Sequence, residues 1–183
     1  MSSYCTVVLR EDLYPGHKAY HDREYGFRTD DDDVLFERLI LEINQAGLSW
    51  ETVLKKREAM NLAYAGFRVS DVAAFDEEKI EEVLGNPGVI RNRLKVLSAV
   101  ENAKRVQALQ ASQGSFSNWL RSHIGLSLEE WTRLMRTHFK FMGPEIVNEF
   151  LMSTGYLPGA HQESCPAYQA VIASCPEWLR AVN

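Results

Sequence analysis

The sequence predicts an all-α fold, and three observations lead to this prediction. Apolar residues recur at helical spacing along most of the chain between residues 34 and 154. Serine, aspartate and glycine stand at the positions where helices begin and end. No alternating run of apolar and polar residues is long enough to predict a strand, and the most strand-like stretch, residues 5–9, is expected to be extended chain.

Length and charge limit the classes of protein to which the chain can belong. The 183 residues predict one domain spanning residues 1–183. Because 20 Lys and Arg stand against 25 Asp and Glu, the net charge is −5, which excludes a generally basic surface for nucleic acid. No window of 18 uninterrupted apolar residues and no signal-peptide pattern occurs, so we expect a cytoplasmic protein that does not contact a membrane.

Cap residues divide the first half of the chain into helices. The acidic run at residues 30–33 offers aspartate N-caps, and Gly47 marks the end of the helix that follows. Ser49, Ser70 and Asp76 are the N-caps expected for three further helices. The predicted helices of this half are residues 34–47, 50–65, 71–75 and 77–84.

A turn cluster at residues 85–88 separates these helices from a long helical pattern in the second half. Loop residues at 112–114 end this pattern, and Pro144 suits the first position of a later helix. The predicted helices are residues 89–111, 116–123, 128–137 and 144–154, followed by two short helices that begin near Glu163 and Pro176. Both ends of the chain are rich in loops.

Four candidate metal ligands lie near the two ends of the chain. Cys5 and His21 are close to the N-terminus, whereas His161 and Cys165 have the spacing H-x3-C, which places both on one face of a helical turn. Two cysteines and two histidines are a composition that closed zinc sites prefer, and such a site would join segments 1–25 and 155–183. The alternatives are buried thiols without a metal and a ligand set that includes His17.

A carboxylate lies beside the apolar face of the predicted helix 34–47. At 100° per residue, Glu42 falls off the polar stripe, so it is either an edge ion-pair partner or a residue that faces a cleft. Tyr20, Tyr25 and Trp50 are close in sequence. A carboxylate among aromatic rings suits a flat cationic or electron-poor ring; the alternative is that these aromatics are core residues.

A candidate hairpin at residues 139–144 separates two helical patterns. Gly143 permits close approach of another backbone, and the free N–H groups of the helix that follows suit a phosphate. Basic residues gather at 133–140, 55–57 and 91–95. Each group alone is typical of a solvated helix face, whereas together they offer the phosphate contacts that an acidic protein needs to bind DNA.

Several motifs in order resemble the bacterial 3-methyladenine DNA glycosylase family, type I, of the helix-hairpin-helix superfamily. The resemblance extends from Cys5 to Cys165, and its most specific parts are QAGLSW at 45–50, LKKRE at 54–58, IRNR at 90–93 and FKFMGP at 139–144. The other matching motifs are Tyr20-His21-Asp22, Leu35-Phe36-Glu37, Leu41-Glu42, Lys95 and Asn102-Ala103.

The resemblance implies an all-α helix-hairpin-helix bundle, a structural zinc ion and a role in base-excision repair. The implied enzyme is a monomer that binds double-stranded DNA with alkylated bases, flips out 3-methyladenine and hydrolyses its N-glycosidic bond without cutting the backbone. The site residues implied are Glu42 as the catalytic, base-contacting carboxylate; Tyr20, Tyr25 and Trp50 for the base; Lys140, Met142 and Gly143 for DNA; and Cys5, His21, His161 and Cys165 for zinc.

The chain also departs from the family pattern around the expected pocket. Val7 and Tyr25 stand where the family has tryptophan, Ile43 replaces a small glycine, and Asn44 replaces a glutamine. Extra residues lie around positions 15–18. Because of these departures a second function stays open. In this alternative the chain is a catalytically altered or inactive glycosylase-like protein that binds damaged or distorted DNA.

Overall fold

The computed structural model describes residues 3–182, and every regular element in this range is helical, which confirms the all-α prediction. None of the described helices is long and apolar enough to cross a membrane. The elements are α1 Tyr4–Val7, α2 Gly16–Arg23, α3 Asp32–Gln45, α4 Trp50–Ala63, η1 Ala65–Phe67, α5 Val69–Ala73, α6 Glu77–Gly85, α7 Arg93–Gln113, α8 Phe116–Arg121, α9 Leu128–His138, α10 Pro144–Ser153, α11 Pro166–Ala173 and η2 Glu177–Val182.

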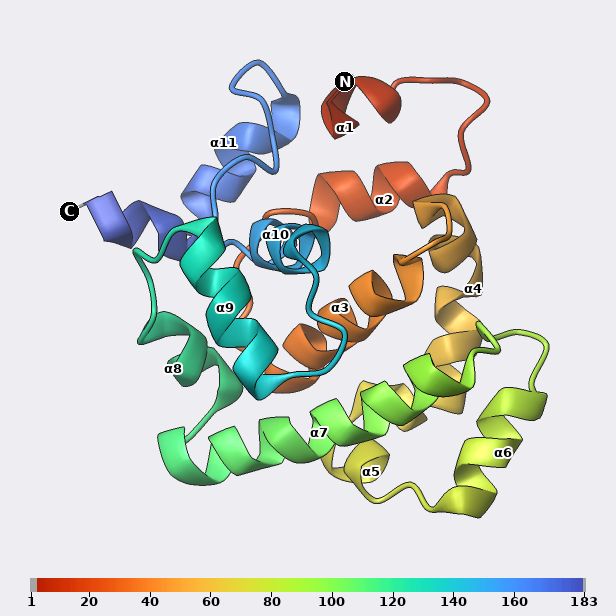
Figure 1. Ribbon diagram of the computed structural model, residues 1–183. Coiled ribbons are helices and arrows are strands. Elements are labelled where there is room, and N and C mark those ends of the chain that lie inside the picture. Colours follow the sequence, from red (N-terminus) through yellow and green to blue (C-terminus); the bar gives the residue numbers. More distant parts are fainter. Residues whose placement is uncertain (1–2, 183) are drawn as a thin grey trace.

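Helix α3 is the centre of the fold. Its apolar side chains are fully buried on several sides of the helix, which is typical of a core helix rather than a surface helix. It packs against α4, α7, α8 and α10, which surround it in Figure 1. A functional side chain on α3 is therefore held by a rigid, densely packed element.

The acidic run at residues 30–33 supplies hydrogen-bond acceptors to the first N–H groups of three helices. Asp31 accepts hydrogen bonds from the first N–H groups of α3, and Asp32 accepts bonds from two N–H groups at the start of α8. Asp33 accepts the Val69 N–H at 2.8 Å. The helix predicted at residues 71–75, with Ser70 as its N-cap, therefore begins earlier, at Val69, because a distant aspartate accepts the N–H of its first residue.

The N-terminal predictions were wrong in two places. Residues 5–9 were expected to be extended, but α1 occupies Tyr4–Val7 because the Ser3 hydroxyl accepts the Thr6 N–H as an N-cap. Helix α2 was not predicted.

The long helix α7 in the middle of the chain begins four residues later than expected, since the Asn92 side chain accepts the Lys95 N–H.

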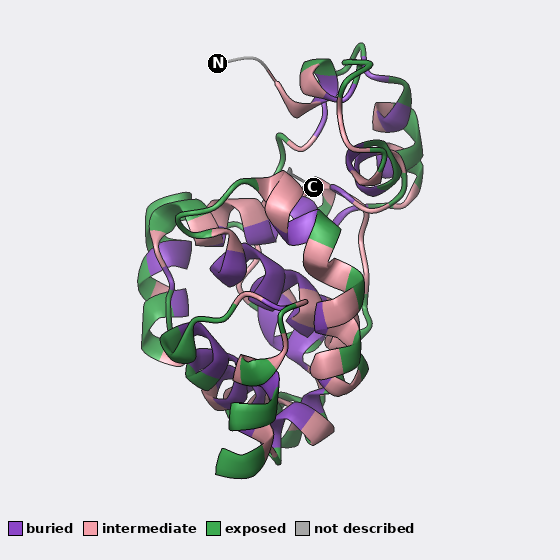
Figure 2. Cartoon of the chain, turned by 90° about the vertical axis from the view of Figure 1, so that its right-hand side faces the viewer, coloured by how far each residue is buried: buried purple, intermediate pink, exposed green. Residues whose placement is uncertain are grey.

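The N-terminal and C-terminal segments meet at one end of the molecule, where α1, α2 and α11 lie together (Figure 1). Figure 2 shows most buried residues in the larger body and a smaller buried group in the narrower end that carries the N-terminus. Cys5, Cys165 and Ala167 form a separate small core there.

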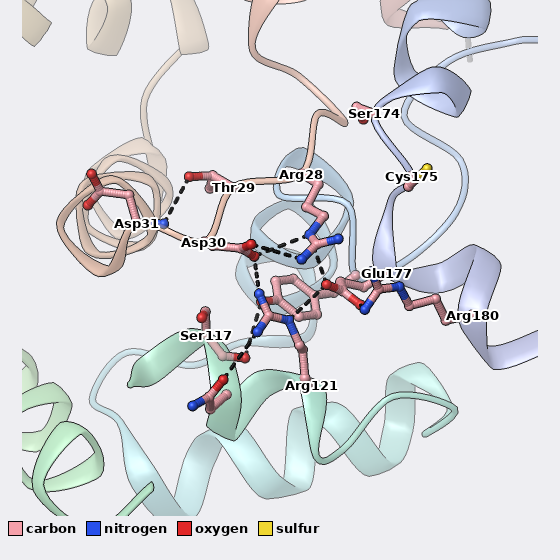
Figure 3. A network of polar contacts seen from close by, with 12 residues as sticks. Arg28, Thr29, Asp30, Asp31, Ser117, Arg121, Ser174, Cys175, Glu177 and Arg180 are labelled. Carbon is pink, nitrogen blue, oxygen red and sulfur yellow. Dashed lines mark hydrogen bonds and ion pairs between the residues drawn. The ribbon is translucent and has the colours of Figure 1, made fainter. Parts of the chain in front are cut away.

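A buried ion-pair network fastens the C-terminal segment to the body (Figure 3). Glu177 is fully buried, and its Oε1 accepts bonds from Arg28 Nε and Arg121 Nε, each at 2.9 Å. Both guanidinium groups also pair with Asp30. The network therefore joins η2 to α8 and to the loop before α3.

Candidate active site

A cavity of 290 Å³ is lined by residues of α1, α2, α3, α4 and α10 and of the loop after α2. Its volume lies near the lower end of the range for ligand pockets, roughly 300 Å³. It brings together all four residues predicted for the base pocket with three others. Its lining residues are Tyr4, Tyr20, Tyr25, Glu42, Gln45, Trp50 and Glu149.

Aromatic rings form the wall of this cavity. The Tyr20 ring lies 5.1 Å from the Trp50 ring and 5.8 Å from the Tyr25 ring, measured between centroids. Tyr4 meets Tyr25 edge to face at 5.3 Å. Trp50 is placed here because Ser49 caps α4 and makes Trp50 its first residue. Such a wall offers π-faces to a flat ring.

Glu42 on α3 is the buried carboxylate of the cavity. Its side chain is only 4% exposed, and it makes no hydrogen bond to another described residue. Burial, and next the nearby Glu149, raise the pKa of Glu42 to about 8, while Arg38 acts in the opposite direction. A buried acceptor without a protein donor is prepared to accept N–H bonds from a ligand.

Glu149 on α10 is a second carboxylate in the same cavity, and sequence reasoning missed it. The Tyr25 hydroxyl donates to Glu149 Oε2 at 2.9 Å. Burial raises the pKa of Glu149, while this hydrogen bond lowers it. The signal was available: Glu149 lies between the buried Val147 and Phe150, so it is on the shoulder of an apolar helix face, as Glu42 is.

Some of the residues that depart from the family pattern line the cavity, and others do not. Val7 and Ile43 do not line the cavity, and Ile43 is fully buried in the core. Tyr4, which was not predicted, supplies an aromatic wall from α1. Tyr25 does line the cavity, so the change from tryptophan adds a hydroxyl that bonds to Glu149.

The four predicted metal ligands come together. The donor atoms of Cys5, His21, His161 and Cys165 all lie within 4.8 Å of one another, and all four residues are buried. Cys165 Sγ lies 3.7 Å from His21 Nε2 and 3.6 Å from His161 Nδ1. Two thiols and two imidazoles facing one another fit the donor set of a tetrahedral zinc site.

Outer hydrogen bonds set the orientation of both imidazoles. His161 Nε2 donates to the Tyr25 carbonyl at 2.7 Å, and His21 Nδ1 lies 2.8 Å from an Asp22 carboxylate oxygen. The other nitrogen of each ring therefore faces the thiols, which is the usual arrangement around a metal. Burial lowers the pKa of His161, so its ring is neutral at pH 7 as a ligand must be.

Two details of the metal prediction change. His161 and Cys165 meet through a turn before α11, where Cys165 is the N-cap residue, and not through a helical turn. The alternative ligand His17 lies outside the cluster, because its Nδ1 is hydrogen-bonded to the Tyr4 hydroxyl at 3.0 Å.

The predicted hairpin connects α9 to α10. The Asn102 side chain fixes it by accepting the Lys140 N–H at 2.8 Å and donating to the Lys140 carbonyl at 3.3 Å. The Lys140 side chain is exposed, whereas Met142 is buried and presents only its backbone. Gly143 has φ −78°, and a Cβ there would meet nothing within 4 Å, so the fold itself does not require this glycine.

Many of the predicted basic residues have partners within the protein. Arg57 pairs with Glu24 and Glu37. Arg93 pairs with two glutamates of α6. Lys95 is buried and donates to the Asn44 and Ala46 carbonyls, so it holds the loop after α3 beside the cavity.

Comparison with known proteins gives a consistent result. The family model for methyladenine glycosylase matches residues 11–132. The chain is 32% identical to DNA-3-methyladenine glycosylase 1 of Escherichia coli (strain K12), over 90% of this chain and 96% of that protein. It is 31% identical to DNA-3-methyladenine glycosylase of Haemophilus influenzae, over 91% and 98%.

Solved structures also match over most of their length. A crystal structure of a substituted 3-methyladenine DNA glycosylase I in complex with 3-methyladenine has a TM-score of 0.78 and 30% identity, covering 87% of this chain and 95% of that one. The Staphylococcus aureus enzyme described for 3-methyladenine recognition has a TM-score of 0.76 and 30% identity, covering 84% and 92%.

Proposed function

Because the chain belongs to the methyladenine glycosylase family, we propose that it excises 3-methyladenine from alkylated double-stranded DNA by hydrolysing the N-glycosidic bond. The observation that carries this proposal is the aromatic-walled cavity around the buried Glu42. An inactive DNA-binding relative would be favoured by a closed pocket, and the pocket is open to a base.

The chemistry requires recognition more than acid catalysis. Methylation at N3 makes adenine a cation within the nucleotide, so the base is already a good leaving group. When the bond between C1′ and the base breaks, its electron pair neutralises the base. Water adds to C1′ and loses a proton, which leaves an abasic site in an intact backbone.

The pocket residues have distinct roles in this proposal. Once the nucleotide is flipped out of the stack, Tyr20, Tyr25 and Trp50 surround the base with π-faces that attract its positive charge. Glu42 in its ionised form accepts N–H bonds from the base and compensates its charge. This recognition favours a cationic base with N–H donors at the matching edge over a neutral base or one without such donors.

The hairpin is the proposed DNA contact. Lys140 supplies a cation, and the open space beside Gly143 lets a phosphate approach the backbone and the first N–H groups of α10. Met142 contributes to this contact through its backbone, since its side chain is buried.

Zinc is proposed to occupy the Cys5, His21, His161 and Cys165 cluster as a structural ion. It would connect the two terminal segments and supply no chemistry to the reaction. The cluster also supports the pocket, because His161 holds the backbone of Tyr25.

The test measures release of 3-methyladenine from methylated duplex DNA by three variants. Glu42→Gln is expected to lower the rate by about 10- to 100-fold, since a charged hydrogen bond is worth ~1.5–3 kcal/mol. Trp50→Ala removes a wall and is expected to reduce release as well. Glu58→Gln, at an exposed position of α4, is the matched control and should behave like wild type. Equal rates for Glu42→Gln and wild type would refute the assigned role.

A further inference from the structure

We propose that Glu149 is a second recognition residue of the base pocket, and that the carboxylates of Glu42 and Glu149 together select a nucleobase that carries a positive charge. This inference rests on the proposed function and deepens it. It assigns to Glu149 a role in specificity that the sequence motifs of the chain do not indicate.

The geometry places both carboxylates on one cavity from two different helices. Glu42 comes from α3 and Glu149 from α10, and both line the cavity with the aromatic rings. The Tyr25 hydroxyl donates to one oxygen of Glu149, which fixes the direction of the carboxylate. A ligand can therefore bond to the remaining lone pairs of the Glu149 carboxylate. Both oxygens of Glu42 are also available to it.

Among the described residues, no cation forms an ion pair with Glu42 or Glu149. Glu149 forms no ion pair there. Arg38 is the one positive group near Glu42, and its guanidinium lies 4.8 Å above the Tyr20 ring and bonds to Glu24. A half-buried carboxylate without a cation costs free energy, so packing and solubility do not account for it. A cationic ligand would compensate this cost.

An independent feature also indicates a missing ligand. The Tyr20 hydroxyl is buried beside the cavity and has no hydrogen-bond partner among the described residues. Glu42, nine-tenths buried and without a hydrogen bond, faces the same space. Buried polar groups are almost always satisfied, so these two groups point to a polar ligand that completes them.

The two like charges couple ligand binding to protonation. Burial and the like charge of Glu149 raise the pKa of Glu42 to about 8, so Glu42 holds its proton at pH 7 in the free pocket. The pocket then has one ionised carboxylate at most. A cationic base stabilises the ionised form of both Glu42 and Glu149, so its binding displaces the proton from Glu42. A neutral base does not displace this proton. The charged or titratable groups around Glu42 are Tyr4, Tyr20, Tyr25, Arg38 and Glu149.

The experiment compares two probes that differ in charge. 3,9-Dimethyladeninium carries a fixed positive charge, and 9-methyladenine is its neutral counterpart. Isothermal titration calorimetry on the full protein gives the affinity for each probe. Wild type is expected to prefer the cation, and Glu149→Gln is expected to lower the affinity for the cation by about tenfold while leaving that for the neutral probe unchanged.

A matched control lies on another helix. Glu78 is exposed on α6 and lines neither the aromatic cavity nor the adjoining cavity that Glu42 and Glu149 share. Glu78→Gln changes the net charge by the same amount and should leave both affinities at the wild-type values. If Glu149→Gln fails to fold, Tyr25→Phe, which removes the hydrogen bond to Glu149, is the second variant and should give a smaller loss for the cation alone.

The pH dependence of the affinity for the cation distinguishes a recognition role of Glu149 from a purely structural one. A structural role would not change this pH dependence. In wild type, affinity for the cation should rise from pH 6 to about pH 8 and then level off, because Glu42 must lose its proton. In Glu149→Gln the rise should end at a lower pH, since the like charge is gone.

The outcomes separate this inference from the proposed function. An unchanged preference for the cation in Glu149→Gln, or no binding of either probe by wild type, overturns the role of the carboxylate pair. Failure of wild type to release 3-methyladenine from methylated DNA overturns the proposed function instead.

Discussion

The residue that defines the site is Glu42, because it is a carboxylate inside a core helix. Its neighbours on α3 are apolar and fully buried, and its pKa is raised to about 8 chiefly by burial. A carboxylate in the unfolded chain has a pKa of about 4.3. The site therefore retains a group that favours unfolding at neutral pH, which is common where function and stability conflict.

Glu42→Gln should stabilise the folded protein in a pH-dependent way. Between about pH 4 and pH 8 the folded state of wild type holds a proton that the unfolded state has lost, so wild-type stability from this group falls as pH rises. The gain in melting temperature of the variant should be larger at pH 8 than at pH 5. A gain that is the same at both pH values would contradict the raised pKa.

At the scale of elements, the hairpin between α9 and α10 depends on a side chain from a third helix. Asn102 on α7 is fully buried and bonds to both the N–H and the carbonyl of Lys140. The exposed loop is therefore fixed to the core, which prepares it for a phosphate at little entropic cost.

Asn102→Ala should weaken binding to duplex DNA and leave recognition of the free base intact. The loss of two hydrogen bonds is expected to cost about 1–3 kcal/mol of stability. Affinity for undamaged duplex DNA, measured by fluorescence anisotropy below the melting temperature, should fall, while affinity for free 3-methyladenine stays at the wild-type value. Unchanged DNA affinity would show that the hairpin is not the contact.

Local signals predicted the elements that local contacts stabilise. Asp31, Ser49 and Asp76 cap their own helices, so α3, α4 and α6 could be read from the sequence. Helix α5 begins at a residue whose N–H is accepted by Asp33, which is 36 positions away. No local pattern contains such a bond, and the same limit applies to α2, which has no side-chain cap. Helix α1 differs, because its N-cap Ser3 is local and was overlooked.

The site was predictable only in part for the same reason. Glu42 and Trp50 belong to two neighbouring motifs, Leu41-Glu42 and QAGLSW, which the resemblance identified, and helix periodicity also singled out Glu42. Glu149 lies in a helix more than 100 positions away, and only the folded chain brings it to Tyr25. The helix-shoulder pattern marks it as a candidate, but the pattern contains nothing about its partner.

At the scale of the whole molecule, two different groups of side chains hold the N-terminal and C-terminal segments in place. The four-residue Cys and His cluster joins α1 and α2 to the start of α11. The buried Glu177 and its arginines join η2 to the body (Figure 3). Tyr25 lines the pocket, its carbonyl is bonded to His161 of the cluster, and Arg28 of the Glu177 network follows three residues later in the chain. The terminal segments therefore support the site and not only the fold.

Cys165→Ser should reduce bound zinc and lower the melting temperature. One zinc per chain is expected in wild type by elemental analysis, and a strong chelator should reproduce the effect of the variant. Cys175→Ser is the matched control, because Cys175 is exposed and outside the cluster. Full zinc content in Cys165→Ser would refute the ligand set.

The central claim is that the chain removes a cationic methylated base from DNA. The most direct measurement is chromatography of the bases that the wild-type protein releases from methylated duplex DNA, combined with gel analysis of the strands. The account predicts free 3-methyladenine and abasic sites in strands that stay intact until alkali is added. Binding to the DNA without release of any base, or strand breaks made by the protein itself, would contradict it.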